Sequence, residues 1–98
     1  MEQKAVEMIS LCNADGKVVP LRFRVRNENE EYVRIDVDEV ISTKHTPYVG
    51  VECFTYLCRA SEGKRRMLVE LKYYIRQHTW FVLGQYQKWT GNEAADHV

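Results

Sequence analysis

Apolar and polar residues alternate almost without interruption along residues 18–40, VVPLRFRVRNENEEYVRIDVDEV. A period of two places successive side chains on opposite faces of a β-strand, whereas a helix would need apolar residues every three or four positions. The segment therefore predicts two antiparallel strands joined by the polar turn NENEE. Phe23 and Ile35 would lie on a dry face of this hairpin, and arginines would lie on its other face.

The same period recurs along the chain, broken by the short turns NADGK, SEGK and RQHT and by a longer irregular stretch, ISTKHTPYVG, which we expect to be a loop. Hairpins without a helical period predict an all-β fold of about six antiparallel strands, as a small barrel or a sandwich, with an SH3-like barrel as one option. We expect a single domain over residues 1–98, with an ordered core over about 5–87 and an irregular, frayed tail over 90–98. The expected strands are residues 6–13, 17–26, 32–40, 51–60, 65–75 and 80–85.

Turn chemistry predicts the register of the strands. In NADGK, Gly16 in the left-handed conformation would make a three-residue loop with a bulge. Pro20 has no backbone N–H to donate, so we expect it at an edge or a bulge. The expected cross-strand pairs are Leu11–Val19, Ile9–Leu21, Val25–Val33, Phe23–Ile35, Leu21–Val37, Phe54–Leu71 and Trp80–Ile75.

The overall charge argues against a dedicated nucleic-acid binder. The chain has 14 basic and 14 acidic residues and an isoelectric point near 6.8. Proteins that bind nucleic acids usually carry a basic excess, which releases counterions from phosphates. Any such role must therefore depend on a local patch. A net charge near zero also removes one protection against self-association.

One such patch is the arginine face of the first hairpins. In the expected register Arg24 lies opposite Arg34, whereas a shift of two residues would place Arg24 opposite Asp36. The face is either a solvated surface with cross-strand ion pairs, or a binding surface for an anionic ligand or nucleic acid with Tyr32 available for stacking. The candidate binding residues of this face are Arg22, Arg24, Arg26, Arg34 and Tyr32.

A second candidate surface is apolar. Several aromatic side chains near the end of the chain are hard to bury if their strand neighbours already face inward. Either the tail folds over them, or they form a patch for a partner protein or a second copy of the chain. The candidate residues for this apolar partner are Tyr74, Phe81, Trp89 and, in the loop STKHTPYV, Tyr48.

No motif points to catalysis, a metal or a cofactor. The chain has no GxSxG, Walker, GxGxxG or HExxH pattern. Its histidines, His45, His78 and His97, have no metal-ligand spacing, and its cysteines, Cys12, Cys53 and Cys58, form no CxxC pair. We therefore expect no enzyme activity, no metal and no cofactor.

Cysteine usage and hydropathy suggest a compartment. Three cysteines without a disulfide framework favour reduced thiols and hence the cytoplasm. The opening MEQKAVEM has no apolar segment of the kind that a secretory signal needs. No apolar run approaches the roughly 20 residues that cross a bilayer, so we expect no membrane partner.

Three segments carry a family resemblance: VVPLRFRV, LVELKYYI and HTWFVL. With these segments the chain, over about residues 8–83, resembles a group of small, uncharacterised bacterial all-β proteins that share a PLRF-like second strand, an ELKY-like fifth strand and a Trp-led last strand. The segment TWFVLG is similar to a strand of WYL domains, which are Sm/SH3-like barrels that sense nucleic-acid ligands. The first resemblance implies no activity, and the second implies a small barrel.

These observations predict a small binding module without catalysis. The first hypothesis is protein–protein interaction or self-association through the apolar candidates. The alternative is a small barrel that binds nucleic acid or another anionic ligand through the arginine face.

Overall fold

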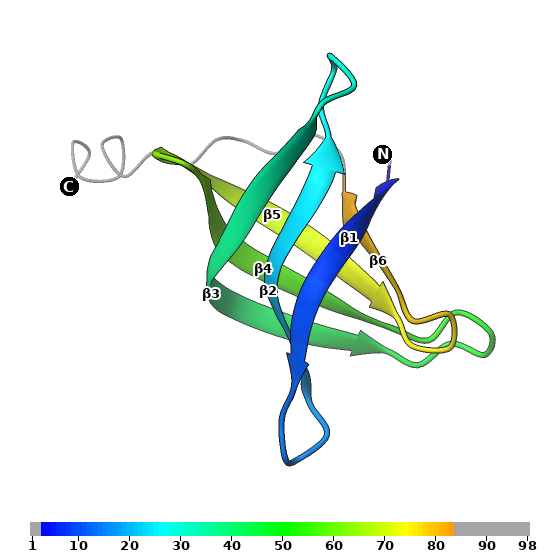
Figure 1. Cartoon of the computed structure of the whole chain (residues 1–98). Helices are drawn as coiled ribbons and strands as arrows, with labels where there is room; N and C mark the ends of the chain where they lie inside the picture. The colour runs from blue at the N-terminus through cyan, green and yellow to red at the C-terminus, as the bar shows by residue number, and fades with distance from the viewer. Residues whose placement is uncertain (1–2, 84–98) are drawn as a thin grey trace.

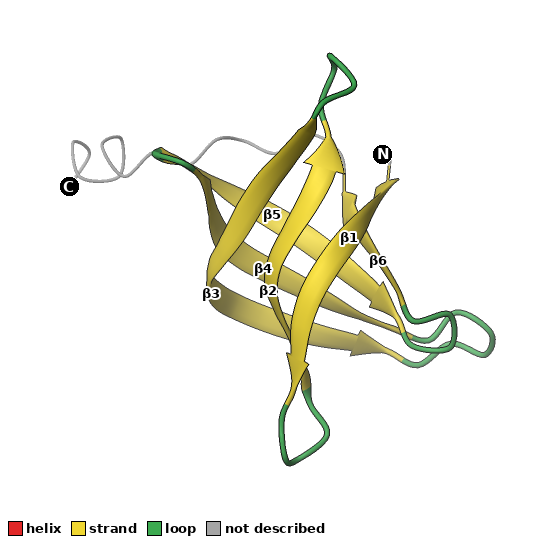
Figure 2. Cartoon of the chain, in the orientation of Figure 1, coloured by secondary structure: helices red, strands yellow, loops and turns green. Residues whose placement is uncertain are grey.

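The computed structural model describes residues 3–83, and this part of the chain is six antiparallel strands without a helix. The strands are β1 (Gln3–Cys12), β2 (Val18–Arg26), β3 (Tyr32–Thr46), β4 (Cys53–Glu62), β5 (Arg65–Tyr74) and β6 (Thr79–Leu83). Each strand pairs with the next along the chain, and β6 returns to pair with β1, so the sheet closes into a barrel (Figures 1 and 2). The all-β prediction is confirmed, and the architecture is a barrel rather than a sandwich.

The end of the chain lies outside the described residues. The predicted tail over residues 90–98 lies outside the described residues, as do the last residues of the predicted sixth strand. Between residues 3 and 83 no helix has the length and apolar character needed to span a bilayer.

The interior is filled mainly from one side of the barrel. Strands β4, β5 and β6 supply most of the buried side chains, and β2 and β3 add Pro20, Phe23 and Ile35. Strand β1 contributes no fully buried residue. The core cluster is Phe23, Ile35, Tyr56, Cys58, Ala60, Val69, Leu71, Trp80 and Val82. The dry face predicted for Phe23 and Ile35 is confirmed.

The hairpin between β2 and β3 has the expected register. Val25 pairs with Val33, and Arg24 lies opposite Arg34, so the alternative shift of two residues does not occur. The turn that joins these strands has the same hydrogen bonds as the turn between β1 and β2. In both turns an asparagine side chain accepts two backbone N–H groups, at Asn13 and at Asn27.

The pairing of β1 with β2 corrects one prediction. Leu11 pairs with Val19 as expected, but Ile9 pairs with Arg22 rather than with Leu21. The register shifts between Ile9 and Ser10, because Leu21 is an extra residue beside Pro20. Consequently Leu21 is 44% exposed, and the expected Leu21–Val37 pair does not form, since Val37 pairs with β4.

The loop predicted over residues 41–50 is wrong for residues 41–46 and confirmed for residues 47–50. Strand β3 continues to Thr46 and pairs along its second half with β4. Two irregularities, at Val37/Glu39 and at Val40/Ser42, shift its register and interrupt the alternation that marked the first half. Figure 1 shows the result, a long strand that bends away from β2 to run beside β4.

The registers of the last two hairpins differ from the predictions by two residues. Leu71 pairs with Tyr56 rather than with Phe54, and Trp80 pairs with Tyr73 rather than with Ile75. Because the shift is an even number, the same side chains still face the interior. The sheet closes where β1 meets β6, and within the described residues this seam joins residues 3–6 to residues 80–83.

Candidate functional site

The arginine face lies on the outside of β1, β2 and β3, and three of its four arginines form ion pairs with carboxylates. Arg24 donates a hydrogen bond to Glu7 at 2.7 Å, and its guanidinium carbon lies 4.3 Å from the centre of the Tyr32 ring. Arg26 lies 5.0 Å from the same ring centre and pairs with Glu30 at 2.9 Å. Both cations thus lie over one aromatic ring that is 50% exposed, and each of them already pairs with a carboxylate.

The protonation of these two arginines is secured by the same contacts. The hydrogen bond to Glu7 raises the pKa of Arg24 above its ordinary value, and the nearby Glu7 charge adds to the effect. The pKa of Arg26 is raised first by Tyr32 and then by Glu30. Since an arginine is always charged at neutral pH, the shifts change no charge state, but they identify Glu7, Tyr32 and Glu30 as the groups that hold these cations.

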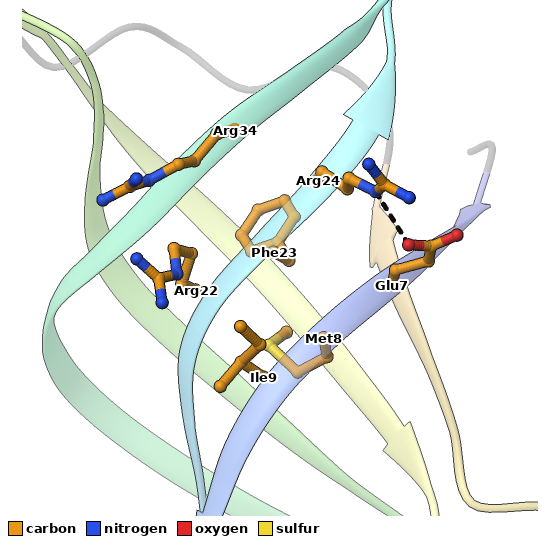
Figure 3. Close-up of a pocket in the computed structure, with 7 residues that line it drawn as sticks. All are labelled: Glu7, Met8, Ile9, Arg22, Phe23, Arg24 and Arg34. Atoms are coloured by element: carbon orange, nitrogen blue, oxygen red, sulfur yellow. Dashed lines mark hydrogen bonds and ion pairs between the residues drawn. The ribbon is translucent and has the colours of Figure 1, made fainter.

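The other two arginines, Arg22 and Arg34, form what we call the arginine pair. Arg34 contacts Asp36 at 3.1 Å, and its side chain is 64% exposed. Within residues 3–83, Arg22 forms no ion pair, although it lies opposite Asp36 in the register. Figure 3 shows both guanidinium groups on one side of a groove of about 400 Å³, away from the Arg24–Glu7 contact.

An aliphatic patch borders the arginine pair. Ile9, Leu11 and Leu21 are 53%, 51% and 44% exposed, and they lie on neighbouring positions of β1 and β2. The turn chemistry predicts Ile9 opposite Leu21, but the bulge at Leu21 separates the two positions and leaves both side chains half-exposed. Pro20 was the signal for this bulge, and it did not indicate which residues the bulge would expose.

The predicted apolar surface is only partly assembled. Tyr74 and Phe81 make an edge-to-face contact with ring centres 5.5 Å apart, and Gln3 donates a hydrogen bond to the Tyr74 hydroxyl. Both rings are half-buried. Tyr48 lies in the β3–β4 loop and is 67% exposed, whereas Trp89 lies outside the described residues.

A cavity of about 360 Å³, which we call the mouth cavity, opens between β2, β3 and β4. Tyr56 is 4% exposed and donates a hydrogen bond to the Val18 carbonyl at 2.7 Å, across from β4 to β2. Burial raises the pKa of Tyr56 to about 12, with smaller contributions from Tyr73 and Cys58. The phenol is therefore a hydrogen-bond donor at neutral pH.

The titratable side chains of residues 3–83 include one deeply buried thiol and two histidines with hydrogen-bond partners. Burial raises the pKa of the Cys58 thiol to about 12, so the thiol is protonated and unreactive at neutral pH. His45 contacts Glu52 at 2.7 Å, and His78 shares a hydrogen bond with the Tyr73 hydroxyl at 3.0 Å. Among residues 3–83 no three His, Cys, Asp or Glu side chains cluster as metal ligands.

Comparison of the chain with family models, curated proteins and solved structures gives no match. Two of the hollows in the described residues have mainly apolar walls. They are the groove beside the arginine pair, into which Ile9 of the aliphatic patch extends, and the mouth cavity.

Proposed function

We propose that this barrel is a non-catalytic protein-interaction module, and that the aliphatic patch and the arginine pair together bind an acidic segment of a partner protein. The observation that carries the proposal is the exposure of Ile9, Leu11 and Leu21 beside Arg22. Apolar side chains that cluster on a surface and are bordered by polar groups are typical of interaction sites. Arginine is also enriched at protein interfaces, where it supplies several directed hydrogen bonds.

The charges favour an acidic partner. Arg22 forms no ion pair within the described residues, and Arg34 shares Asp36 while remaining largely exposed. A carboxylate in the groove would accept hydrogen bonds from these guanidinium groups, and such charge-assisted bonds are stronger than neutral ones. Apolar side chains of the same segment would cover the aliphatic patch.

Two other occupants are less well supported. Nucleic acid would need Arg24, Arg26 and Tyr32, but Glu7 and Glu30 already pair with these arginines, and the arginines lie over the ring. Self-association through Tyr74 and Phe81 would use rings that are half-buried against each other. We also propose a cytoplasmic location, because the three cysteines are free and two of them are buried.

A labelled peptide of alternating Asp and Leu tests this proposal by fluorescence anisotropy. We expect saturable binding that Ile9→Ser and Arg22→Glu each weaken by about tenfold, because one removes apolar contact and the other reverses the charge in the groove. Arg76→Glu is the matched control, since Arg76 is exposed in the β5–β6 turn, far along the chain from the groove. It should leave binding unchanged.

Three results would overturn the proposal. The first is no binding of the peptide, and the second is an equal loss with Arg76→Glu, which would indicate unspecific attraction. The third is tighter binding of a single-stranded oligonucleotide that weakens steeply with salt, which would favour the nucleic-acid alternative.

A further inference from the structure

The mouth cavity exists because β3 leaves β2 part-way along its length. Pairing between these strands ends at Arg22 and Asp36, whereas β3 goes on pairing with β4 as far as Thr46. The first residues of β2 therefore face the second half of β3 without a ladder of hydrogen bonds between them. Figure 1 shows this divergence, and the cavity of about 360 Å³ lies between the two strands and β4.

The cavity wall is mostly apolar. Val18 comes from β2, Val40 from β3, and Phe54 and Tyr56 from β4. The Tyr56 hydroxyl is already engaged with the Val18 carbonyl, so this polar atom adds no unsatisfied donor to the wall. Small-molecule sites commonly have volumes of about 300–1,000 Å³ and occur in the mouths of β-barrels. The mouth cavity meets both criteria.

The rim of the cavity is cationic. Lys17 also lines the cavity, and its side chain is exposed and forms no ion pair within residues 3–83. Thr43 is the exposed polar residue that lines the cavity on the β3 side. An apolar hollow with one positive charge at its edge complements a molecule that has an apolar body and one negative end.

We propose that the mouth cavity binds a small acyl-chain carboxylate, with its chain between Val40 and Phe54 and its carboxylate at Lys17. The site lies on different residues from the aliphatic patch and the arginine pair, so this inference is independent of the proposed protein-interaction function. No covalent step is involved. The ligand would be held by burial of its chain and by one exposed charge contact.

Calorimetric titration of the full chain with octanoate and with 1-octanol tests the proposal. We expect saturable binding of octanoate that is tighter than that of 1-octanol by about fivefold, as one exposed ion pair allows. Lys17→Glu should remove this preference and leave the affinity for 1-octanol unchanged. Lys44→Glu is its control, because Lys44 is exposed on β3 but does not line the cavity.

A second pair of variants tests the position of the chain. Thr43→Trp would fill the cavity from an exposed position and should weaken both ligands by at least about tenfold. Ser42→Trp is its neighbour on the same strand, does not line the cavity, and should bind as the wild type does. Changes in the NMR chemical shifts of the Val18 and Val40 backbone amides when octanoate is added to the wild type give a measurement that does not depend on how any variant folds.

The outcomes are decisive in both directions. Saturable binding of octanoate with shifts at Val18 and Val40, and loss of binding in Thr43→Trp but not in Ser42→Trp, supports the site. Absence of saturable binding of octanoate, or equal loss in Ser42→Trp, overturns it. Binding of 1-octanol as tight as that of octanoate overturns the assignment of a carboxylate.

Discussion

The two walls of this barrel differ in what their side chains do. Strands β4, β5 and β6 bury residues such as Leu71 and Val82 and form the greater part of the core. Strand β1 buries no residue fully, and the outer faces of β1 and β2 carry half-exposed aliphatic residues and arginines. The side chains that fill the core are thus largely separate from these exposed ones, so that the outer surface of β1 and β2 can vary with little effect on the fold.

The largest expected effect is in the core of the packed wall. Leu71→Ala should lower the free energy of unfolding by about 2–5 kcal/mol, because Leu71 is 0% exposed and its removal leaves a cavity. Ile9→Ala on the other wall should change it by no more than about 0.5 kcal/mol. Urea unfolding of the two variants measures both values. Similar decreases in the free energy of unfolding for the two variants would show that the two walls contribute equally to stability.

An intermediate effect on stability is expected at Tyr56, whose hydrogen bond to Val18 connects the two walls. Tyr56→Phe removes the hydrogen bond to the Val18 carbonyl and should cost about 1 kcal/mol at neutral pH. Burial raises the pKa of Tyr56 to about 12, above the value near 10 expected when unfolded. The stabilising contribution of this group is therefore complete below about pH 10 and is lost as the pH rises through about 12.

The stability gap between the wild type and Tyr56→Phe should consequently narrow in alkali. Urea midpoints at increasing pH would show it, because only the wild type has a phenol at position 56 that ionises on unfolding. The Cys58 thiol, whose pKa burial also raises to about 12, is present in both proteins and so cancels. A constant gap up to about pH 11 would contradict the assignment of this shift to Tyr56.

The smallest expected effect is in the two equivalent turns of the less packed wall. Gly16 and Glu30 occupy the same left-handed position, with φ of 83° and 64°. Gly16→Ala should destabilise the barrel by about 1 kcal/mol, because a side chain is strained there. Glu30→Gly should stabilise it by about 0.5 kcal/mol, since relief of backbone strain exceeds the loss of an exposed ion pair with Arg26.

Thermal unfolding of these two variants measures whether each substitution raises or lowers the stability of the barrel. Glu30→Gln is the control for Glu30→Gly, because it breaks the same ion pair with Arg26 without changing the backbone. If Glu30→Gly destabilises as much as Glu30→Gln does, the backbone at Glu30 is not strained, and the two turns are not equivalent in energy.

Much of the fold could be predicted from alternation and turn chemistry. The pairing of Val25 with Val33 follows from the pattern on both sides of a polar turn, and the loop at Gly16 follows from its glycine. The later registers could not be predicted, because a shift of two residues keeps every side chain on its face. The β4–β5 turn has its left-handed residue at Gly63, as a glycine there would predict. The β5–β6 turn has its left-handed residue at His78, and the sequence has no glycine in that turn to indicate it.

The candidate site was harder to predict than the fold. The sequence placed four arginines on one face, but it could not show that Glu7 on the next strand and Glu30 in the turn would neutralise two of them. The aliphatic patch was not predicted because strict alternation places Leu21 on the same face as Phe23. The bulge beside Pro20 breaks that alternation and leaves Leu21 exposed. The mouth cavity was missed because the bend of β3 falls where its pattern breaks.

Because β1 pairs with β6, the barrel can close only after the last of the described strands has been synthesised. Val6 meets Trp80, so the ring cannot be completed until almost all of the described chain has emerged from a ribosome. At usual rates of synthesis the first strand would wait on the order of ten seconds with one edge unpaired. During that interval its free backbone groups are open to a chaperone or to a neighbouring nascent chain.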